Sequence, residues 1–298
     1  MRAPVALAAL LWCAQSWGQV CCVGGGAIEP ARLMLHERGL VALQLQGGVG
    51  VGSLSRDGAW VQPPEGTQAL QLQQSLIGTV RLFRRAQLSL TVPLVENLRR
   101  AGALAAAEQG AGLGDVSLSG RWDFIHPGES SRLPGIAVEV GTVLPTGRAL
   151  EAARLPLGSD ATGAGAVQAL AGVSAEEVFG RFVLSGRLLG AVALPRRVYG
   201  MEVQPGPELT AMLAGGWSPD EASELALVLS TARAAETRIG GAVAKGSGRA
   251  LTRVALSGAR ELVQGWRLNA AVTSDLPWLG HNRELAAGFS LMMVRSFD

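Results

Sequence analysis

The most constraining feature of this chain is a two-residue alternation in GLGDVSLSGRWDF, residues 112–124. Apolar or small side chains from Val116 to Phe124 share one parity, and polar side chains from Asp115 to Asp123 share the other. Successive side chains of a β-strand point to opposite faces, so the pattern predicts a strand with one apolar and one polar face. Burying charge in a dry core is costly, so the charged face belongs beside water. It is either the outside of a soluble sandwich or the inside of a water-filled barrel.

Similar alternation recurs along most of the chain and predicts about twelve strands, most of them long enough for a tilted membrane crossing. Connections after odd-numbered strands are mostly long, and those after even-numbered strands are short, as in outer-membrane barrels. We therefore predict an all-β fold, a single up-and-down antiparallel transmembrane β-barrel over residues 40–298. The predicted strands are 40–53, 67–83, 86–94, 112–124, 136–144, 167–173, 182–192, 208–217, 224–230, 251–258, 266–273 and 285–297.

The polar parity of these strands defines a predicted lumen lining, and the aromatic residues near the short turns define a predicted membrane girdle. The charges are nearly balanced, so they either form a cross-strand ladder that holds a narrow lumen together or act as a selectivity lining with slight anion preference. The predicted lumen-lining residues are Gln44, Gln46, Gln71, Gln73, Arg81, Asp115, Arg121, Asp123, Glu139, Arg181, Arg187, Glu208, Glu224, Arg253 and Arg267. The predicted girdle residues are Trp122, Phe124, Phe182, Trp217, Trp266 and Phe297.

The first residues indicate export. Residues 1–18 carry Arg2, then a short apolar run and small residues, the pattern of a secretory signal peptide. Residues 19–39 are predicted to be a periplasmic leader or a short plug. Their adjacent Cys21 and Cys22 are either two thiols, an intermolecular bridge or a strained vicinal disulfide, and the pattern leaves their state open. Together with the barrel pattern, this predicts a location in the outer membrane.

Composition and motifs argue against several other functions. The net charge is +2 and the sequence has no basic block, so we expect no nucleic-acid partner. It shows no metal-spaced cluster and no nucleophile elbow, so we expect no enzyme, no cofactor and no metal. An Asp275–His281 pair on an outer rim, able to activate water, is the weakest alternative. His126 beside Pro127 is interpreted as a turn residue.

Three stretches also carry a resemblance: GLGDVSLSGRWDF at 112–124, PGIAVEV at 134–140 and LPTG at 144–147. With these stretches the chain resembles the outer-membrane β-barrels of the MetA-pathway-of-phenol-degradation family, which are described as transporters. The resemblance implies a passive channel or transporter for small molecules. Its expected partners are outer-membrane lipid, the barrel-assembly machinery and an unknown small-molecule solute. The alternative is a barrel without transport that serves as a structural or adhesive outer-membrane protein.

Overall fold

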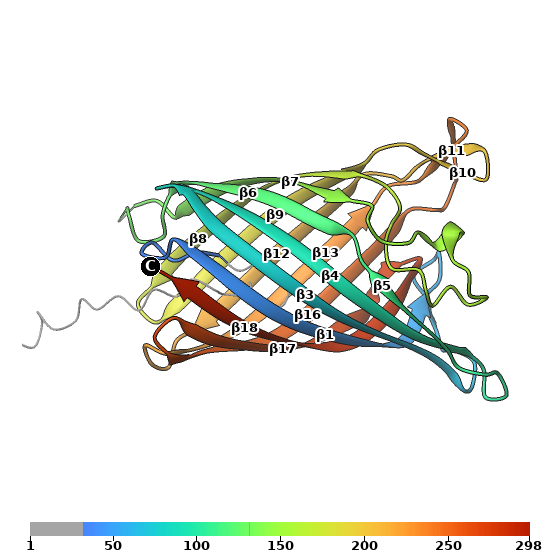
Figure 1. The fold of residues 1–298 in the computed structure, drawn as a ribbon, viewed down its shortest axis with the longest axis horizontal. Coiled ribbons are helices and arrows are strands. Elements are labelled where there is room, and N and C mark those ends of the chain that lie inside the picture. Colours follow the sequence, from blue (N-terminus) through green and yellow to red (C-terminus); the bar gives the residue numbers. More distant parts are fainter. Residues whose placement is uncertain (1–31, 131) are drawn as a thin grey trace, which may run out of the picture.

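The structure is a computed structural model and describes residues 32–130 and 132–298. Twelve antiparallel strands pair in chain order, and the last pairs with the first, so they form one closed barrel (Figure 1). The predicted fold class is confirmed, whereas the predicted signal peptide and the cysteine pair lie outside the described residues. The barrel strands are β1 (Gly39–Leu54), β3 (Thr67–Phe83), β4 (Ala86–Ala101), β6 (Val116–Ile125), β7 (Gly135–Leu144), β8 (Gln168–Phe179), β9 (Phe182–Ala193), β12 (Glu208–Trp217), β13 (Ser223–Ala234), β16 (Arg249–Val263), β17 (Trp266–His281) and β18 (Arg283–Phe297).

The barrel closes along a long seam between its first and last strands. The register of β1 and β18 runs from Gly39 opposite Phe297 to Leu54 opposite Arg283. One irregularity, between Gly50 and Gly52 on β1, interrupts this register. Closure leaves no unpaired edge along the seam, which a membrane requires because lipid offers no hydrogen bonds to the backbone.

The outer surface of the barrel is apolar along the middle of its strands. Leu43, Leu76, Val140, Leu227 and Val272 lie on five different strands and are between 54% and 62% exposed. Soluble monomers rarely expose apolar surface of this extent, so the band marks a lipid-facing surface. In the part of the chain that the structure describes, no helix is long and apolar enough to cross a membrane.

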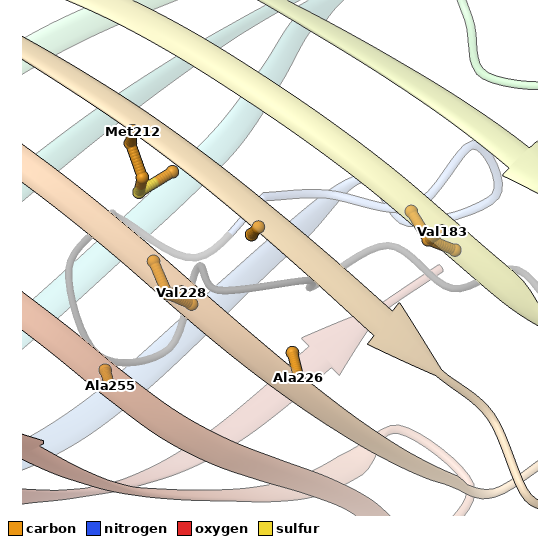
Figure 2. Packing of buried hydrophobic residues seen from close by; sticks show 6 residues of the cluster. Val183, Met212, Ala226, Val228 and Ala255 are labelled. Carbon is orange, nitrogen blue, oxygen red and sulfur yellow. The ribbon is translucent and has the colours of Figure 1, made fainter.

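The inner face is mixed rather than uniformly polar. Ser75 and Thr79 on β3 are buried toward the interior, as the alternation predicts. The inner face of β9, β12, β13 and β16 instead carries an apolar cluster, of which Figure 2 shows the members side by side. The expectation of a polar second face on every strand is therefore wrong in this sector. The cluster comprises Val183, Met212, Ala214, Ala226, Val228 and Ala255.

The two ends of the barrel differ (Figure 1). At the end that holds the C-terminus, which we call the short-turn end, strands join through brief connections such as Arg84–Arg85 and Gly180–Arg181. Gly180 has a φ of 63°, a conformation that a two-residue hairpin favours and that glycine adopts without strain. At the opposite, long-loop end, four further short strands form a separate small sheet. They are β10 (Arg196–Val198), β11 (Met201–Gln204), β14 (Arg238–Ile239) and β15 (Ala242–Val243).

Several strand bounds differ from the prediction. Strand β8 continues to Phe179, so the segment AEEVF, which was predicted to be a turn, is strand. The strand predicted at 112–124 is broken, because β5 (Glu108–Leu113) pairs only with β4 whereas β6 starts at Val116. Pairing of β17 with β18 stops at Ser274 opposite Ala287, so these strands diverge toward the long-loop end. The remaining short elements are β2 (Trp60–Val61) and a 3-10 turn at Leu150–Ala152.

Candidate functional site in the barrel interior

A ladder of ion pairs crosses the inner face of β6, β7 and β9 near the short-turn end. Arg121 on β6 donates from Nε to Asp123 Oδ1 at 3.0 Å and from Nη1 to Glu139 Oε1 on β7 at 2.8 Å. Arg187 on β9 pairs with the second oxygen of Glu139. These side chains are only 7% to 14% exposed. Each charge has an opposite partner, which offsets part of the cost of its burial.

Residues 32–38, which we call the inner segment, bind the inner wall of the barrel at the short-turn end. Arg81 on β3 donates from Nε to the carbonyl of Glu37 at 2.9 Å and from Nη2 to the carbonyl of Met34 at 2.6 Å. The Glu37 carboxylate accepts from the Met34 amide at 2.7 Å and pairs with Arg267 on β17 at 3.1 Å. Glu37 is 1% exposed, so its charge depends on these partners.

Leu33 fixes the inner segment through apolar contacts. It is 4% exposed and belongs to a cluster built from the inner faces of β1, β3 and β18. Its amide also donates to Gln87 Oε1 on β4 at 3.1 Å. Burying a leucine side chain contributes about 1.5–3 kcal/mol, so Leu33 is the main apolar anchor of the segment. Its partners in the cluster are Leu40, Ala42, Ile77, Met292 and Val294.

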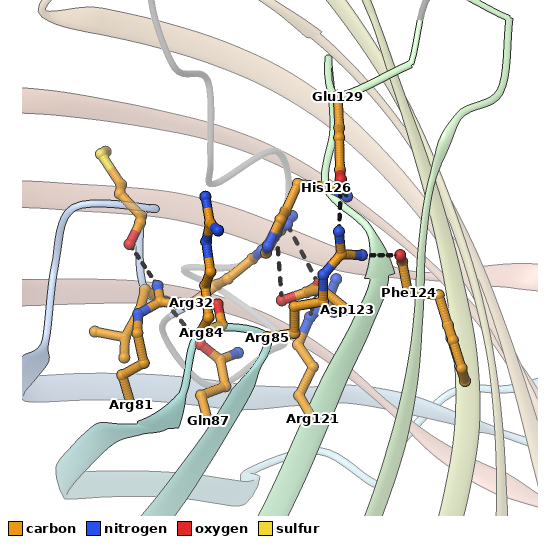
Figure 3. A network of polar contacts seen from close by, with 12 residues as sticks. Arg32, Arg81, Arg84, Arg85, Gln87, Arg121, Asp123, Phe124, His126 and Glu129 are labelled. Atoms are coloured by element: carbon orange, nitrogen blue, oxygen red, sulfur yellow. Dashed lines mark hydrogen bonds and ion pairs between the residues drawn. The ribbon is translucent and has the colours of Figure 1, made fainter.

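Arg32 connects the inner segment to the ion-pair ladder (Figure 3). One of its nitrogens lies 3.5 Å from Asp123 Oδ1, and another lies 3.4 Å from Glu176 Oε1 on β8. The Arg32 side chain is 14% exposed. The inner segment therefore places the Arg32 guanidinium against β6 and β8, and the Leu33 side chain against β1, β3 and β18.

His126 begins the turn that follows β6, and its Nδ1 lies 3.9 Å from Asp123 Oδ2. Burial lowers the pKa of His126, and the charges of Arg32 and Arg85 act in the same direction, whereas Asp123 and Glu129 oppose them. The imidazole is accordingly neutral at pH 7, and it adds no positive charge to the ladder. Its backbone amide donates to the Glu129 carboxylate, in agreement with its predicted place in a turn.

The structure brings six of the predicted lumen residues together at the short-turn end. Arg81 and Arg267 hold the inner segment, Arg121, Asp123, Glu139 and Arg187 form the ladder, and Glu224 lies farther around the wall on β13. The early glutamines lie on β1 and β3, where Gln44 donates to Ser290 Oγ at 3.3 Å, Gln73 donates to Ser75 Oγ at 3.0 Å, and Gln71 is exposed. Toward the long-loop end, Arg253 pairs with Asp275 at 2.7 Å, and Glu208 lies 3.9 Å from Arg249.

Two predicted lumen residues lie elsewhere. Arg181 is in the two-residue turn after β8, is exposed and donates to the carbonyl of Pro219 at 3.1 Å, because the turn takes it out of the strand alternation. Asp115 lies in the break between β5 and β6, where its carboxylate accepts from the amides of Gly147 and Ala164 at 2.9 and 2.6 Å. Both corrections follow from the strand ends, which alternation alone locates poorly.

The six predicted girdle residues all lie at strand ends near the short turns and are between 40% and 59% exposed. Trp217 pairs with Phe182 across β12 and β9. Arg295 lies over the rings of both Trp266 and Phe297, at 5.5 and 5.6 Å from their centroids. Phe83 and Phe179 share this level, with 69% and 59% exposure, and were not predicted.

The loop 145–167 folds against the inner side of β4 and β5 at the long-loop end. Asn97, which is buried on the inner parity of β4, donates from Nδ2 to the carbonyls of Ser159 and Ala161 at 2.9 Å each. The Glu108 carboxylate on β5 accepts from the amides of Leu157 and Ser159. The GLGD and LPTG stretches meet at the base of this loop, since Thr146 Oγ1 donates to the carbonyl of Gly114 at 2.7 Å.

Asp160 organises the tip of this loop, and we expect Asp160→Asn to loosen it. Hydrogen bonds from the amides of Arg154 and Leu155 and from the Arg148 guanidinium lower the pKa of Asp160 below its usual 3.8. A carboxyl with a lowered folded-state pKa stabilises the loop fully above the usual value, and this contribution is lost as pH falls through the lowered pKa. At neutral pH the variant should therefore show faster amide hydrogen exchange at residues 154–155, measured by mass spectrometry.

The control for that prediction is Asp57→Asn, at an exposed position in another loop of the same end. It should leave exchange at residues 154–155 unchanged. Equal exchange in the parent protein and in Asp160→Asn would show that this carboxylate does not hold the loop.

The rim pair proposed from the sequence is not assembled. Asp275 lies within β17 and is 3% exposed, and its carboxylate accepts from Arg253 Nε and from the amide of Ala286 at 2.8 Å. His281 ends the same strand, opposite Ala250. Among residues 32–130 and 132–298, no cluster of three histidine, cysteine or carboxylate side chains is placed to hold a metal ion.

Sequence reasoning missed Arg32, Glu37 and Glu176. Glu176 was assigned to a turn, although it continues the inward parity of Gly172 and Ser174 along β8, and that alternation was the available signal. The inner segment has no such signal, because its contacts run to strands up to 230 residues away in the sequence.

Comparison with known proteins gives the fold and little more. No family model matches the sequence, and no curated protein matches it. The structure is similar to the crystal structure of an outer membrane channel from Pseudomonas putida F1, with a TM-score of 0.74 and 15% identity, over 90% of this chain and 97% of the other. It is also similar to the transport unit of the autotransporter AIDA-I from Escherichia coli, with a TM-score of 0.51 and 11% identity, over 92% and 95%. The chain has the fold of outer-membrane β-barrels, as the sequence resemblance implies.

Proposed function

We propose that this barrel lets small solutes pass through its interior, as a passive channel or transporter. The observation that carries the proposal is the set of inner polar atoms without a protein partner in the described part of the chain, namely both amide atoms of Asn269, the Ser185 hydroxyl and Glu224 Oε1. Polar atoms withdrawn from bulk solvent are normally hydrogen-bonded, so water is their expected partner. A hydrated interior inside a lipid-facing wall supports a route for polar solutes. The shared fold with a known outer membrane channel supports the same proposal.

In this proposal the predicted lumen residues on the inner wall line the route, apart from the two that lie elsewhere. The inner segment narrows it at the short-turn end, and the loop 145–167 narrows it at the other. The ion-pair ladder favours the interpretation of the charges as a structural ladder, because each ladder guanidinium already has a carboxylate partner. Lipid headgroups contact the girdle residues, and the barrel-assembly machinery reads the last strand, which places Phe297 at its end.

A structural or adhesive barrel without transport is the second candidate. The small sheet of β10, β11, β14 and β15 favours it, because this sheet stands at the long-loop end and exposes Tyr199, Met201, Ile239 and Val243. We propose no enzymatic activity, since the Asp275 carboxylate is engaged by Arg253 and is not paired with His281.

The proposal is tested first in proteoliposomes. The full chain is expressed in a Gram-negative host, recovered from outer membranes, and checked for a shift in gel mobility on boiling. Vesicles that contain the folded barrel should swell faster in a small sugar than protein-free vesicles. A heat-shifted band without faster swelling, both in the parent protein and in an Arg81→Ala variant that loosens the inner segment, would instead favour the structural barrel.

A further inference from the structure

The inner wall that Arg32 contacts is short of one positive charge. On β6 to β9 the wall carries three carboxylates, Asp123, Glu139 and Glu176, against two guanidiniums, Arg121 and Arg187, so its charge is −3 + 2 = −1. Arg32 supplies the missing cation. Farther around the wall, Glu224 on β13 interacts electrostatically with Glu176 and with Arg267, and Arg267 already pairs with Glu37 of the inner segment. His126 is neutral, so no other described group of this sector replaces Arg32.

The contacts of Arg32 are longer than those within the ladder. Charge-assisted hydrogen bonds between nitrogen and a carboxylate typically measure about 2.7–2.9 Å. Arg121 meets Glu139 at 2.8 Å, whereas Arg32 lies 3.4 and 3.5 Å from its two carboxylates. The contacts from Arg32 to Asp123 and Glu176 are therefore longer than the contact between Arg121 and Glu139 within the ladder.

The remaining contacts of the segment complete a three-point site. Leu33 fills the apolar cluster on β1, β3 and β18, and its amide donates to Gln87 on β4, between the apolar and the acidic sides. The wall thus recognises a cation, an amide N–H and an aliphatic group in succession. The carboxylates, the Gln87 side chain and the apolar cluster belong to strands of the barrel wall. The cation, the amide and the aliphatic side chain that contact them belong to the inner segment.

We propose that Arg32 and Leu33 occupy a solute-binding subsite of the lumen, whose ligand class is small cationic molecules with an aliphatic group next to an amide. This inference rests on the proposed passage of solutes and specifies what the passage binds. In the structure, Arg32 and Leu33 of the inner segment occupy the places that the cation and the aliphatic group of the ligand would take. A solute of this class binds when the segment withdraws, with its cation between Asp123 and Glu176 and its aliphatic group against Ile77 and Met292.

The test uses acetyl-arginyl-leucine amide as the probe and calorimetric titration of the full, folded barrel in detergent. The variant Arg32→Ala with Leu33→Ala vacates both places and should bind the probe at least about tenfold more tightly than the parent protein. Adding Glu176→Gln should weaken this binding about tenfold or more, because a charge-assisted contact is lost. The matched control, Glu177→Gln, changes a neighbouring residue on the opposite parity of β8 and should leave binding unchanged.

Three results would overturn the inference in a barrel that still shows the heat-dependent gel shift. The first is that the probe does not bind to the variant with Arg32→Ala and Leu33→Ala. The second is that acetyl-glutamyl-leucine amide binds to this variant as tightly as the probe does. The third is that Glu176→Gln and Glu177→Gln weaken probe binding equally. Binding needs no transport, so the two proposals fail separately. Probe binding without solute passage would contradict only the proposed function, and solute passage without probe binding would contradict only the subsite.

Discussion

Leu76→Arg is expected to lower the free energy of unfolding of the membrane-inserted barrel by about 2–4 kcal/mol, the cost of an arginine on the lipid face near the bilayer midplane. Leu76 lies near the middle of β3, on the outer parity, and is 54% exposed. In a soluble protein the same exposed position would accept arginine at almost no cost. The measurement is an equilibrium denaturant titration in phospholipid vesicles.

The matched control is Gln73→Arg, on the same strand but on the inner parity, where Gln73 donates to Ser75. An arginine there meets water, so we expect a loss below about 1 kcal/mol. Equal losses for the two variants would mean that the outer face of β3 does not contact lipid, and would contradict the orientation of the barrel wall.

Leu33→Asp is expected to release the inner segment and to increase solute passage. The substitution removes about 1.5–3 kcal/mol of apolar burial and also places a carboxylate in an apolar cluster, so the total cost exceeds about 2 kcal/mol. A change of this size shifts the ratio of released to bound segment by about 30-fold or more. Swelling of proteoliposomes in a small sugar should therefore become several-fold faster than with the parent protein.

Leu35→Asp is the control for that prediction, because Leu35 belongs to the same segment but is 50% exposed. It introduces the same charge without removing buried apolar surface, so it should swell at the parental rate. An unchanged rate in Leu33→Asp, with a folded barrel, would show that the inner segment does not limit passage.

The barrel itself was predictable because its wall separates water from lipid, and that separation imposes a two-residue period on each strand. The residues from which β3 and β12 were predicted all lie within the observed strands. Strand ends and breaks were less predictable, because they depend on hydrogen bonds from distant loops. Asp115 shows this, since its partners come from both ends of the loop 145–167.

The candidate site was predicted in part. Alternation places Arg121, Glu139 and Arg187 on the inner face, but it cannot say which charges meet, because pairing depends on strand register and barrel curvature. The inner segment was predicted only as a leader or a short plug, since seven residues without periodicity carry no information about where they bind. The predicted location of Arg181 failed because Gly180 and Arg181 form the turn between β8 and β9, so Arg181 lies outside the strand alternation.

Single-channel recording in a planar bilayer tests the central claim, an aqueous route through the barrel, most directly. Purified, heat-shifting parent protein should produce stepwise currents whose size grows with salt concentration, and Leu33→Asp should produce larger or more frequent steps. A flat baseline for both proteins, at amounts at which the folded barrel is demonstrably inserted, would contradict the account.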